Sequence, residues 1–147
     1  MKTLYMAYGS NMNLQQMCQR CPTATVVGKI ILKGYQLHFR GMDYGAVATI
    51  EKNTRGAVPV LLWDLEPEDE NALDRYEGFP YLYRKEYLRV RYDHKWHNAM
   101  VYIMNPGRRL GRPSPGYYKT IKDGYANAGF DIEYLNEAVK ASAKQIL

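Results

Sequence analysis

Two short segments of the chain carry residues whose types and spacing suit anion binding or acid–base chemistry. The first is Tyr8-Gly9-Ser10-Asn11, which follows an apolar run. A glycine at the end of a strand lets the chain turn sharply, so that consecutive backbone N–H groups can point into one cavity and hold an anion or an oxyanion. An ordinary turn at the end of a strand explains the same residues. The segment is neither a P-loop nor a Gly-x-Ser-x-Gly nucleophile elbow.

The second segment ends on Glu77, in the last turn of a helix predicted over residues 67–77. The negative end of the helix dipole disfavours a carboxylate there, and Asp74 adds like charge one turn earlier. Three aromatic neighbours would keep water away: Tyr76, Phe79 and Tyr81. All these effects raise the pKa of Glu77 toward that of a general base near neutral pH. The alternative is a solvated acid at a helix end.

Two further clusters contain residue types that bind metals or nucleic acids. Cys18 and Cys21 could join His94 and His97 in a zinc site, but the two pairs are remote in sequence and the His pair falls in a predicted hairpin turn. No thioredoxin-like βαβ pattern surrounds the Cys-x-x-Cys pair. We therefore expect no metal, no redox site and no cofactor.

The basic loop Arg108-Arg109-Leu110-Gly111-Arg112 precedes Tyr117 and Tyr118. Basic residues beside aromatic ones are typical of nucleic-acid binding. An anionic small substrate or a solvated loop explains them equally well. Since a solvated loop is the commonest case, we do not expect nucleic acid as a partner.

Composition limits the class of protein. A chain of 147 residues with 46% hydrophobic and 24% charged residues forms one domain, residues 1–147, with an ordinary core. Tyrosine supplies 14 of the 19 aromatic residues, which suits a core that borders a polar pocket. The net charge is +5, yet residues 64–77 hold seven acids and one base. The rest of the chain is therefore strongly basic.

No apolar secretory segment begins the chain, no apolar run is long enough to cross a bilayer, and two cysteines make no disulfide scaffold. We therefore expect a cytoplasmic protein without a membrane partner.

The elements that must position these residues follow from apolar patterns and turn signals. Strands are predicted at residues 3–8, 25–33, 35–39, 46–51, 57–65, 81–92 and 95–104. Breaks are expected at Lys33-Gly34 and in the polar stretch 52–56. Helices are predicted at residues 14–18, 67–77 and 115–128 and after Asp131. This order predicts an α+β domain built on a mixed or antiparallel sheet, and such a sheet could close into a barrel.

Taken together, the segments resemble the gamma-glutamylcyclotransferase family. Residues 4–12 look like the family's first strand and its Tyr-Gly-Ser-Asn loop, and Arg20-Cys21-Pro22 like the element after it. Leu73-Asp74 with Glu77-Gly78 and Tyr83 looks like the catalytic-acid segment. Residues 113–134 resemble the C-terminal helices. Four matching pieces in order cover nearly the whole chain.

The resemblance implies a small mixed β-barrel with flanking helices and an enzyme that needs no cofactor. The reaction would cleave a γ-glutamyl amide to 5-oxoproline and a free amine or amino acid, as part of glutathione metabolism. The substrate's own α-amine attacks its γ-carbonyl, and such ring closure can carry effective molarities on the order of 10⁵–10⁸ M.

The resemblance also implies the roles of the site residues. Glu77 would be the catalytic general acid and base, taking a proton from the attacking amine and returning one to the leaving nitrogen. The N–H groups of the loop would stabilise the oxyanion or hold the substrate carboxylate. The substrate-binding residues implied are Tyr8, Gly9, Ser10, Asn11, Met12, Tyr83 and Tyr117.

The spelling Tyr-Gly-Ser-Asn differs from the loops of the glutathione-specific and γ-glutamylamine branches, which favours γ-glutamyl amino acids as substrates. A homologue that trims γ-glutamyl groups from a larger biosynthetic amine is an alternative. A basic module that binds nucleic acid or an acidic partner is another. The sequence does not give the oligomeric state, and the resemblance is consistent with a homodimer.

Overall fold

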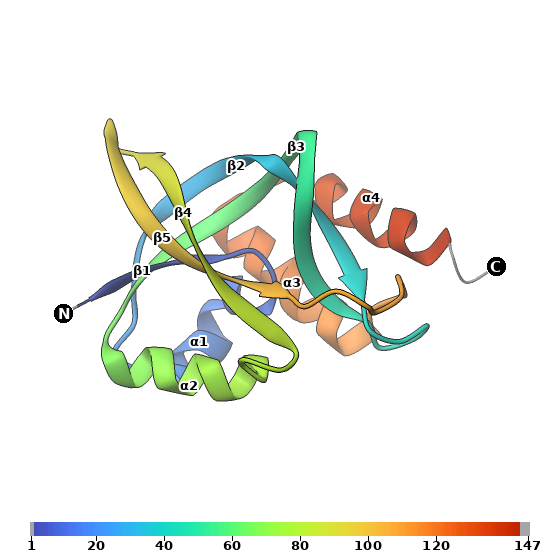
Figure 1. Ribbon diagram of the computed structural model, residues 1–147, viewed down its shortest axis with the longest axis horizontal. Coiled ribbons are helices and arrows are strands. Elements are labelled where there is room, and N and C mark those ends of the chain that lie inside the picture. Colours follow the sequence, from blue (N-terminus) through green and yellow to red (C-terminus); the bar gives the residue numbers. More distant parts are fainter. Residues whose placement is uncertain (1, 145–147) are drawn as a thin grey trace.

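One curled five-stranded sheet organises the protein, with helices against it (Figure 1). The computed structural model describes residues 2–144. Its elements, in chain order, are β1 (Thr3–Ala7), the 3₁₀ turn η1 (Ser10–Met12), α1 (Leu14–Arg20), β2 (Thr25–Arg40), β3 (Val47–Leu65), α2 (Pro67–Glu77), β4 (Tyr83–Tyr92), β5 (Lys95–Met104), α3 (Pro115–Ala128) and α4 (Ile132–Ala143).

The strand order is β2-β3-β1-β5-β4. β1 runs antiparallel to β3 and parallel to β5, so the sheet is mixed and the expected α+β class is confirmed. The short β1 joins two long hairpins, β2–β3 and β4–β5, which diverge beyond it (Figure 1). Within residues 2–144 no pairing joins β2 to β4, so the sheet curls around the core without closing.

Both strand breaks predicted within the first hairpin are wrong. β2 and β3 each run through their predicted interruption, and pairing resumes on both sides of Gly34. Lys33 faces Ala57 and Tyr35 faces Lys52, so one residue of β2 lies opposite four of β3. Gly34 has a φ of 88°, which a glycine adopts without strain. The polar stretch is therefore a bulge that bends the hairpin over the core.

The helix ends follow local capping rules. Glu66 and Asp69 form a reciprocal capping box around Pro67, the first residue of α2, and Gly78 ends the helix with a φ of 69°. Ser114 caps α3 through its side chain, which accepts the N–H of Tyr117. These helices agree with the sequence prediction. α1 extends two residues beyond the predicted end at Cys18, and this adds Arg20 to the helix.

Two contacts from α3 hold η1 in place. A Cβ atom on Gly124 would lie 2.8 Å from the Met12 Cβ and 2.9 Å from its carbonyl carbon, so only glycine allows this approach. The Asn13 side chain caps α1 and donates to the Thr120 carbonyl at 3.0 Å. The turn after β1 therefore rests on the C-terminal part of the chain. No helix within residues 2–144 has the length and apolar character to cross a bilayer.

Candidate active site

A narrow pocket of about 20 Å³ lies where β1, η1, α2 and the sheet meet. It is called the Glu77 pocket below. Its walls are Tyr5, Tyr8, Gly9, Ser10, Asn11, Ala48, Glu77, Tyr83, Tyr102 and Tyr117. Five of these ten residues are tyrosines, from β1, β4, β5 and α3 and from the residue that follows β1. The tyrosine excess of the sequence is therefore concentrated in part on one polar cavity.

The turn after β1 contributes Gly9, Ser10 and Asn11 to the pocket wall. Met12 and Asn13 donate to the carbonyls of Gly9 and Ser10 at 3.0 Å, so these two amides are used within the turn. The N–H groups of Ser10 and Asn11 precede the first bonded amide, as at the start of any helical turn. A Cβ on Gly9 would lie 3.1 Å from the Ala48 Cβ, so glycine lets β3 pack against the turn.

Glu77 reaches the same pocket from the last turn of α2. The residue as a whole is partly exposed, but its carboxyl group is buried, and Asn11 Nδ2 donates to its Oε1 at 3.4 Å. Burial raises the pKa of Glu77 to about 7, while the Arg20 charge and the Asn11 hydrogen bond lower it. The structure therefore brings the loop and the acid together across 66 residues of sequence.

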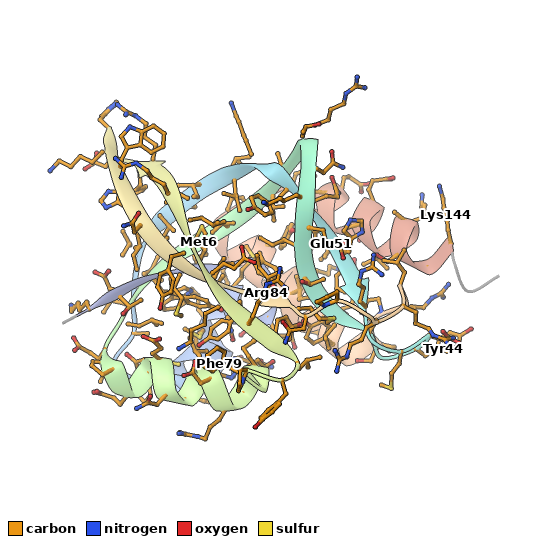
Figure 2. All side chains as sticks on the ribbon, viewed as in Figure 1. Met6, Tyr44, Glu51, Phe79, Arg84 and Lys144 are labelled. Atoms are coloured by element: carbon orange, nitrogen blue, oxygen red, sulfur yellow. The ribbon has the colours of Figure 1, made fainter. Side chains whose placement is uncertain are left out.

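The causes of this burial differ from those predicted. Phe79 lies where α2 ends beneath β4 (Figure 2), and Lys85 Nζ is 4.5 Å from its ring centre. Tyr81 is 85% exposed. Tyr76 is also exposed, and its hydroxyl contacts Ser10 Oγ at 2.9 Å. None of these three rings lines the pocket, and the tyrosines of the sheet and α3 remove water from Glu77 instead.

Asp74 also acts differently from the prediction. Its carboxylate accepts a hydrogen bond from the Tyr102 hydroxyl at 2.6 Å and forms an ion pair with Lys85 Nζ at 3.0 Å. Its charge is therefore neutralised beneath the sheet, and it holds the ring of Tyr102 in the pocket wall instead of repelling Glu77.

The tyrosine hydroxyls divide into two classes by their backbone partners. Tyr8 donates to the Tyr102 carbonyl at 2.6 Å, and Tyr83 donates to the Ala48 carbonyl at 2.5 Å. Each hydroxyl already donates its hydrogen to a backbone carbonyl, so toward a molecule in the pocket it can act only as a hydrogen-bond acceptor.

Tyr5 and Tyr117 have the opposite polarity. The Tyr5 hydroxyl accepts from Asn11 Nδ2 at 2.8 Å, and the Tyr117 hydroxyl accepts the Ala48 N–H at 3.0 Å. Their own hydrogens are available to donate. Burial raises the pKa of both hydroxyls, so both stay protonated at neutral pH.

The matched family decides what this site is. The model described as "Gamma-glutamyl cyclotransferase, AIG2-like" matches residues 5–124. The chain belongs to this family. The match spans the turn after β1, α2 and most of α3, which are the elements that build the Glu77 pocket. Members of the family are cyclotransferase enzymes, so the expected family and the expectation of an enzyme are both confirmed.

Known gamma-glutamyl cyclotransferases resemble the chain over most of its length. Human gamma-glutamylcyclotransferase is 29% identical, in an alignment that covers 94% of this chain and 77% of the human protein. The solved structure of a gamma-glutamyl cyclotransferase has a TM-score of 0.83 at 26% identity, over 94% of this chain and 86% of that chain. A crystal structure of an uncharacterized human protein has a TM-score of 0.81 at 27% identity, and the match covers 93% of this chain and 86% of that chain.

Within this cyclotransferase fold, most residues proposed for the site lie in the pocket wall, and Met12 does not. The Met12 side chain is 0% exposed and packs beneath Gly124 of α3. It points into the core because the 3₁₀ turn directs Ser10 and Asn11 toward the pocket and the third residue away from it. Met12 therefore supports the loop from the core and does not line the pocket.

Three wall residues escaped the sequence prediction: Tyr5, Ala48 and Tyr102. Strand alternation assigns a residue to one face of a strand, but it does not say where along that face a pocket opens. Tyr5 lies within the segment that resembles the family, so that resemblance was an available signal for it. No sequence signal marks Ala48, whose backbone, not its side chain, holds two hydroxyls.

The basic loop of the cyclotransferase packs along the turn between β2 and β3. Arg109 pairs with Asp43 at 3.1 Å, and Arg40 donates to the Arg108 carbonyl at 2.9 Å. The Arg112 carbonyl accepts the N–H groups of Gly45 and Ala46. These contacts fasten the loop to the hairpin. None of its residues lines the Glu77 pocket.

The cysteine and histidine pairs lie apart in the fold. Cys21 is buried, and its thiol contacts the Asp69 carbonyl at 3.5 Å, while Cys18 is exposed. His94 and His97 lie at the turn between β4 and β5 and at the start of β5.

A larger hollow lies on another part of the described surface. It has a volume of about 680 Å³ between β3 and the β4–β5 hairpin, and Figure 2 shows Glu51 and Arg84 on its two sides. Its two acids are each paired, Glu51 with Arg40 and Glu86 with Arg84. Glu77, whose pKa is about 7, and the hydroxyl groups of Tyr5 and Tyr117, whose hydrogens are available to donate, lie in the smaller Glu77 pocket. This pocket is therefore the candidate active site.

Proposed function

We propose that the protein cleaves a γ-glutamyl amide by intramolecular attack of the substrate's α-amine on its γ-carbonyl, releasing 5-oxoproline and a free amine or amino acid. The observation that supports this most directly is the contact of Asn11 with Glu77. It joins an anion-binding turn to a carboxyl whose pKa is about 7, inside a wall of hydroxyl groups. Cyclisation needs these groups and no protein nucleophile.

Glu77 carries the proton between the two nitrogens. The α-amine starts as an ammonium with a pKa of about 8, so ionised Glu77 takes one proton and frees the nitrogen lone pair for attack. The new C–N bond forms a five-membered ring and places a negative charge on the carbonyl oxygen. The protonated carboxyl of Glu77 then gives its proton to the leaving nitrogen as the old C–N bond breaks and the oxyanion re-forms the carbonyl. The ring nitrogen still carries a second proton, which it loses to the ionised Glu77, and Glu77 passes this proton to the released amine, so that the carboxylate is restored.

The polarity of the hydroxyl groups matches the head group of an α-amino acid. Tyr5 and Tyr117, with the N–H groups of Ser10 and Asn11, offer donors for the α-carboxylate or for the oxyanion. Tyr8 offers an acceptor for the α-ammonium. Tyr83 offers a second acceptor. A γ-glutamyl group carries both charges at one carbon, which favours it over an amide without this zwitterion.

We propose a γ-glutamyl amino acid as the substrate class. The leaving group would extend toward solvent, which leaves a γ-glutamyl derivative of a larger amine as the alternative. We further propose that the reaction takes place in the cytoplasm and that the assembly is a homodimer, which light scattering after gel filtration would test.

A panel of γ-glutamyl compounds tests the proposal. The panel contains γ-glutamyl-alanine, glutathione, a γ-glutamylamine and α-glutamyl-alanine, and the measured product is 5-oxoproline. We expect release from γ-glutamyl-alanine and none from the α-linked control, and we expect Glu77→Gln to lose turnover while it keeps the fold. Wild-type turnover in Glu77→Gln would remove Glu77 as the base, and no release from any γ-glutamyl compound would remove the activity.

A further inference from the structure

Arg20 lies just outside the Glu77 pocket and touches one of its walls. Its Nη1 donates to Asn11 Oδ1 at 2.6 Å, and its Nη2 donates to Gln16 Oε1 at 3.0 Å. The two bonds use separate arms of the planar guanidinium and hold it in one orientation. Arg20 is half-buried at the last residue of α1.

A second contact clamps the same guanidinium. Its carbon lies 3.5 Å from the centre of the Tyr76 ring, a cation–π stacking distance. The Tyr76 hydroxyl in turn contacts Ser10 Oγ at 2.9 Å. Arg20, at the end of α1, therefore connects α2 with the turn after β1, and these are the two segments that meet at the pocket.

The contact with Asn11 has a consequence for the direction of hydrogen bonds inside the pocket. A carboxamide has one acceptor end and one donor end, and the two have nearly the same shape. An arginine can only donate, so the Oδ1 end of Asn11 must face Arg20. The Nδ2 end then faces the pocket, where it donates to the Tyr5 hydroxyl at 2.8 Å and to Glu77 Oε1 at 3.4 Å.

If the amide of Asn11 were turned over, both inner contacts would change sign. Its oxygen would face the Glu77 carboxylate, which is unfavourable, and the Tyr5 hydroxyl would have to donate to Asn11. The Tyr5 hydrogen would then be lost to the substrate. The direction set by Arg20 thus decides whether Tyr5 can donate into the pocket and whether Glu77 receives a hydrogen bond.

We propose that Arg20 is a positioning residue of this site: its guanidinium fixes the orientation of the Asn11 amide and thereby directs Asn11 toward Glu77 and the Tyr5 hydroxyl toward substrate. This inference rests on the proposed function for its effect on catalysis. Its effect on Glu77 is a property of the free protein and needs no substrate.

Arg20 also acts on Glu77 through its positive charge, because the other groups that face Glu77 are neutral. Four tyrosine hydroxyls face Glu77: Tyr5 on β1, Tyr8 just after β1, Tyr83 on β4 and Tyr117 on α3. Burial raises the pKa of all four hydroxyls, so they are neutral near pH 7. Arg20 supplies the positive charge that lowers the pKa of Glu77 against its burial.

The test follows the Glu77 carboxyl by carbon-13 NMR in protein labelled at the glutamate carboxyl carbon, with Glu77→Gln to assign its signal. We expect Arg20→Ala to raise the pKa of Glu77 by about one unit. Arg20→Lys keeps the charge without the two-armed geometry, so its titration should lie nearer that of the wild type while turnover still falls. Arg55→Ala removes an exposed arginine of the β3 bulge and should change neither property.

A double-mutant cycle tests whether Arg20 acts through Asn11. We expect Arg20→Ala to lower kcat/KM about tenfold in the wild-type background and to have a much smaller effect beside Asn11→Ala. Equal effects in the two backgrounds would overturn the route through Asn11. A folded Arg20→Ala protein with an unchanged Glu77 titration would overturn the proposal as a whole. A shifted titration without turnover of any γ-glutamyl compound would contradict the proposed function alone.

Discussion

The backbone N–H of Ala48 donates to the Tyr117 hydroxyl at 3.0 Å. This contact occupies a lone pair of the phenol oxygen and leaves its hydrogen for a molecule in the Glu77 pocket. The Ala48 carbonyl accepts from Tyr83, so the backbone of one residue of β3 sets opposite polarities on two tyrosines. A site with both donors and acceptors is thus built on a rigid strand.

Tyr117→Phe should lower kcat/KM by roughly tenfold to a hundredfold, because one donor to the carboxylate or oxyanion is lost. The change also leaves the Ala48 N–H without its partner, at a cost of about 1–3 kcal/mol. Steady-state kinetics with γ-glutamyl-alanine and urea unfolding measure the two effects. Tyr118→Phe is the matched control, since the Tyr118 hydroxyl donates to Asn136 on α4, away from the pocket. An equal kinetic loss in both variants would contradict the role of Tyr117.

The pH dependence of kcat/KM should be bell-shaped. The acidic side should fall about tenfold per pH unit below pH 7, because Glu77 must be ionised to accept a proton and burial raises its pKa to about 7. The alkaline side should fall above about pH 8, where the substrate ammonium loses its proton. Glu68→Gln, an exposed acid on the same helix, should leave the profile unchanged. If kcat/KM falls only below pH 5, the group that accepts the proton is not Glu77.

Glu77→Gln should be more stable than the wild type above pH 7. The pKa of Glu77 is about 7 in the folded protein against 4.5 for the free group, so unfolding releases a proton between these pH values. Wild-type stability therefore falls as the pH rises through this window, by roughly 2–3 kcal/mol in total. The glutamine variant lacks this loss. Urea unfolding at pH 4, 6 and 8 should show a gap that widens with pH, and a constant gap would refute the prediction.

Gly124→Ala should disturb the active site from a distance. The new Cβ would lie 2.8 Å from the Met12 Cβ and 3.0 Å from the Asn13 nitrogen, so η1 must move. We expect a loss of about 1–3 kcal/mol in unfolding free energy together with reduced turnover. Gly116→Ala lies in the same helix with no neighbouring atom within 4 Å and should keep full activity. If both variants behave alike, the contact between α3 and the turn is not what holds the loop.

The features that local chemistry controls could be predicted from the sequence. The signals at Pro67, Gly78, Ser114 and Gly129 mark helix ends because capping depends on residues within one turn of the end. The bulge opposite Gly34 was predicted as a strand break because a polar stretch looks the same whether pairing stops or resumes after it. That outcome depends on a partner strand, which local pattern does not include.

Sequence by itself therefore determined the family, the class of fold and two of the segments that line the candidate site, the turn after β1 and the end of α2 with Glu77. Only the tertiary structure decided which side chains line the pocket and in which direction their hydrogen bonds run. Asp74 is paired beneath the sheet, Met12 faces the core, and Tyr5 and Tyr102 line the cavity. The direction of a hydroxyl's hydrogen bond is set by its partner, and Tyr117 finds that partner 69 residues away on β3. Residue type offers both polarities, and only packing selects one.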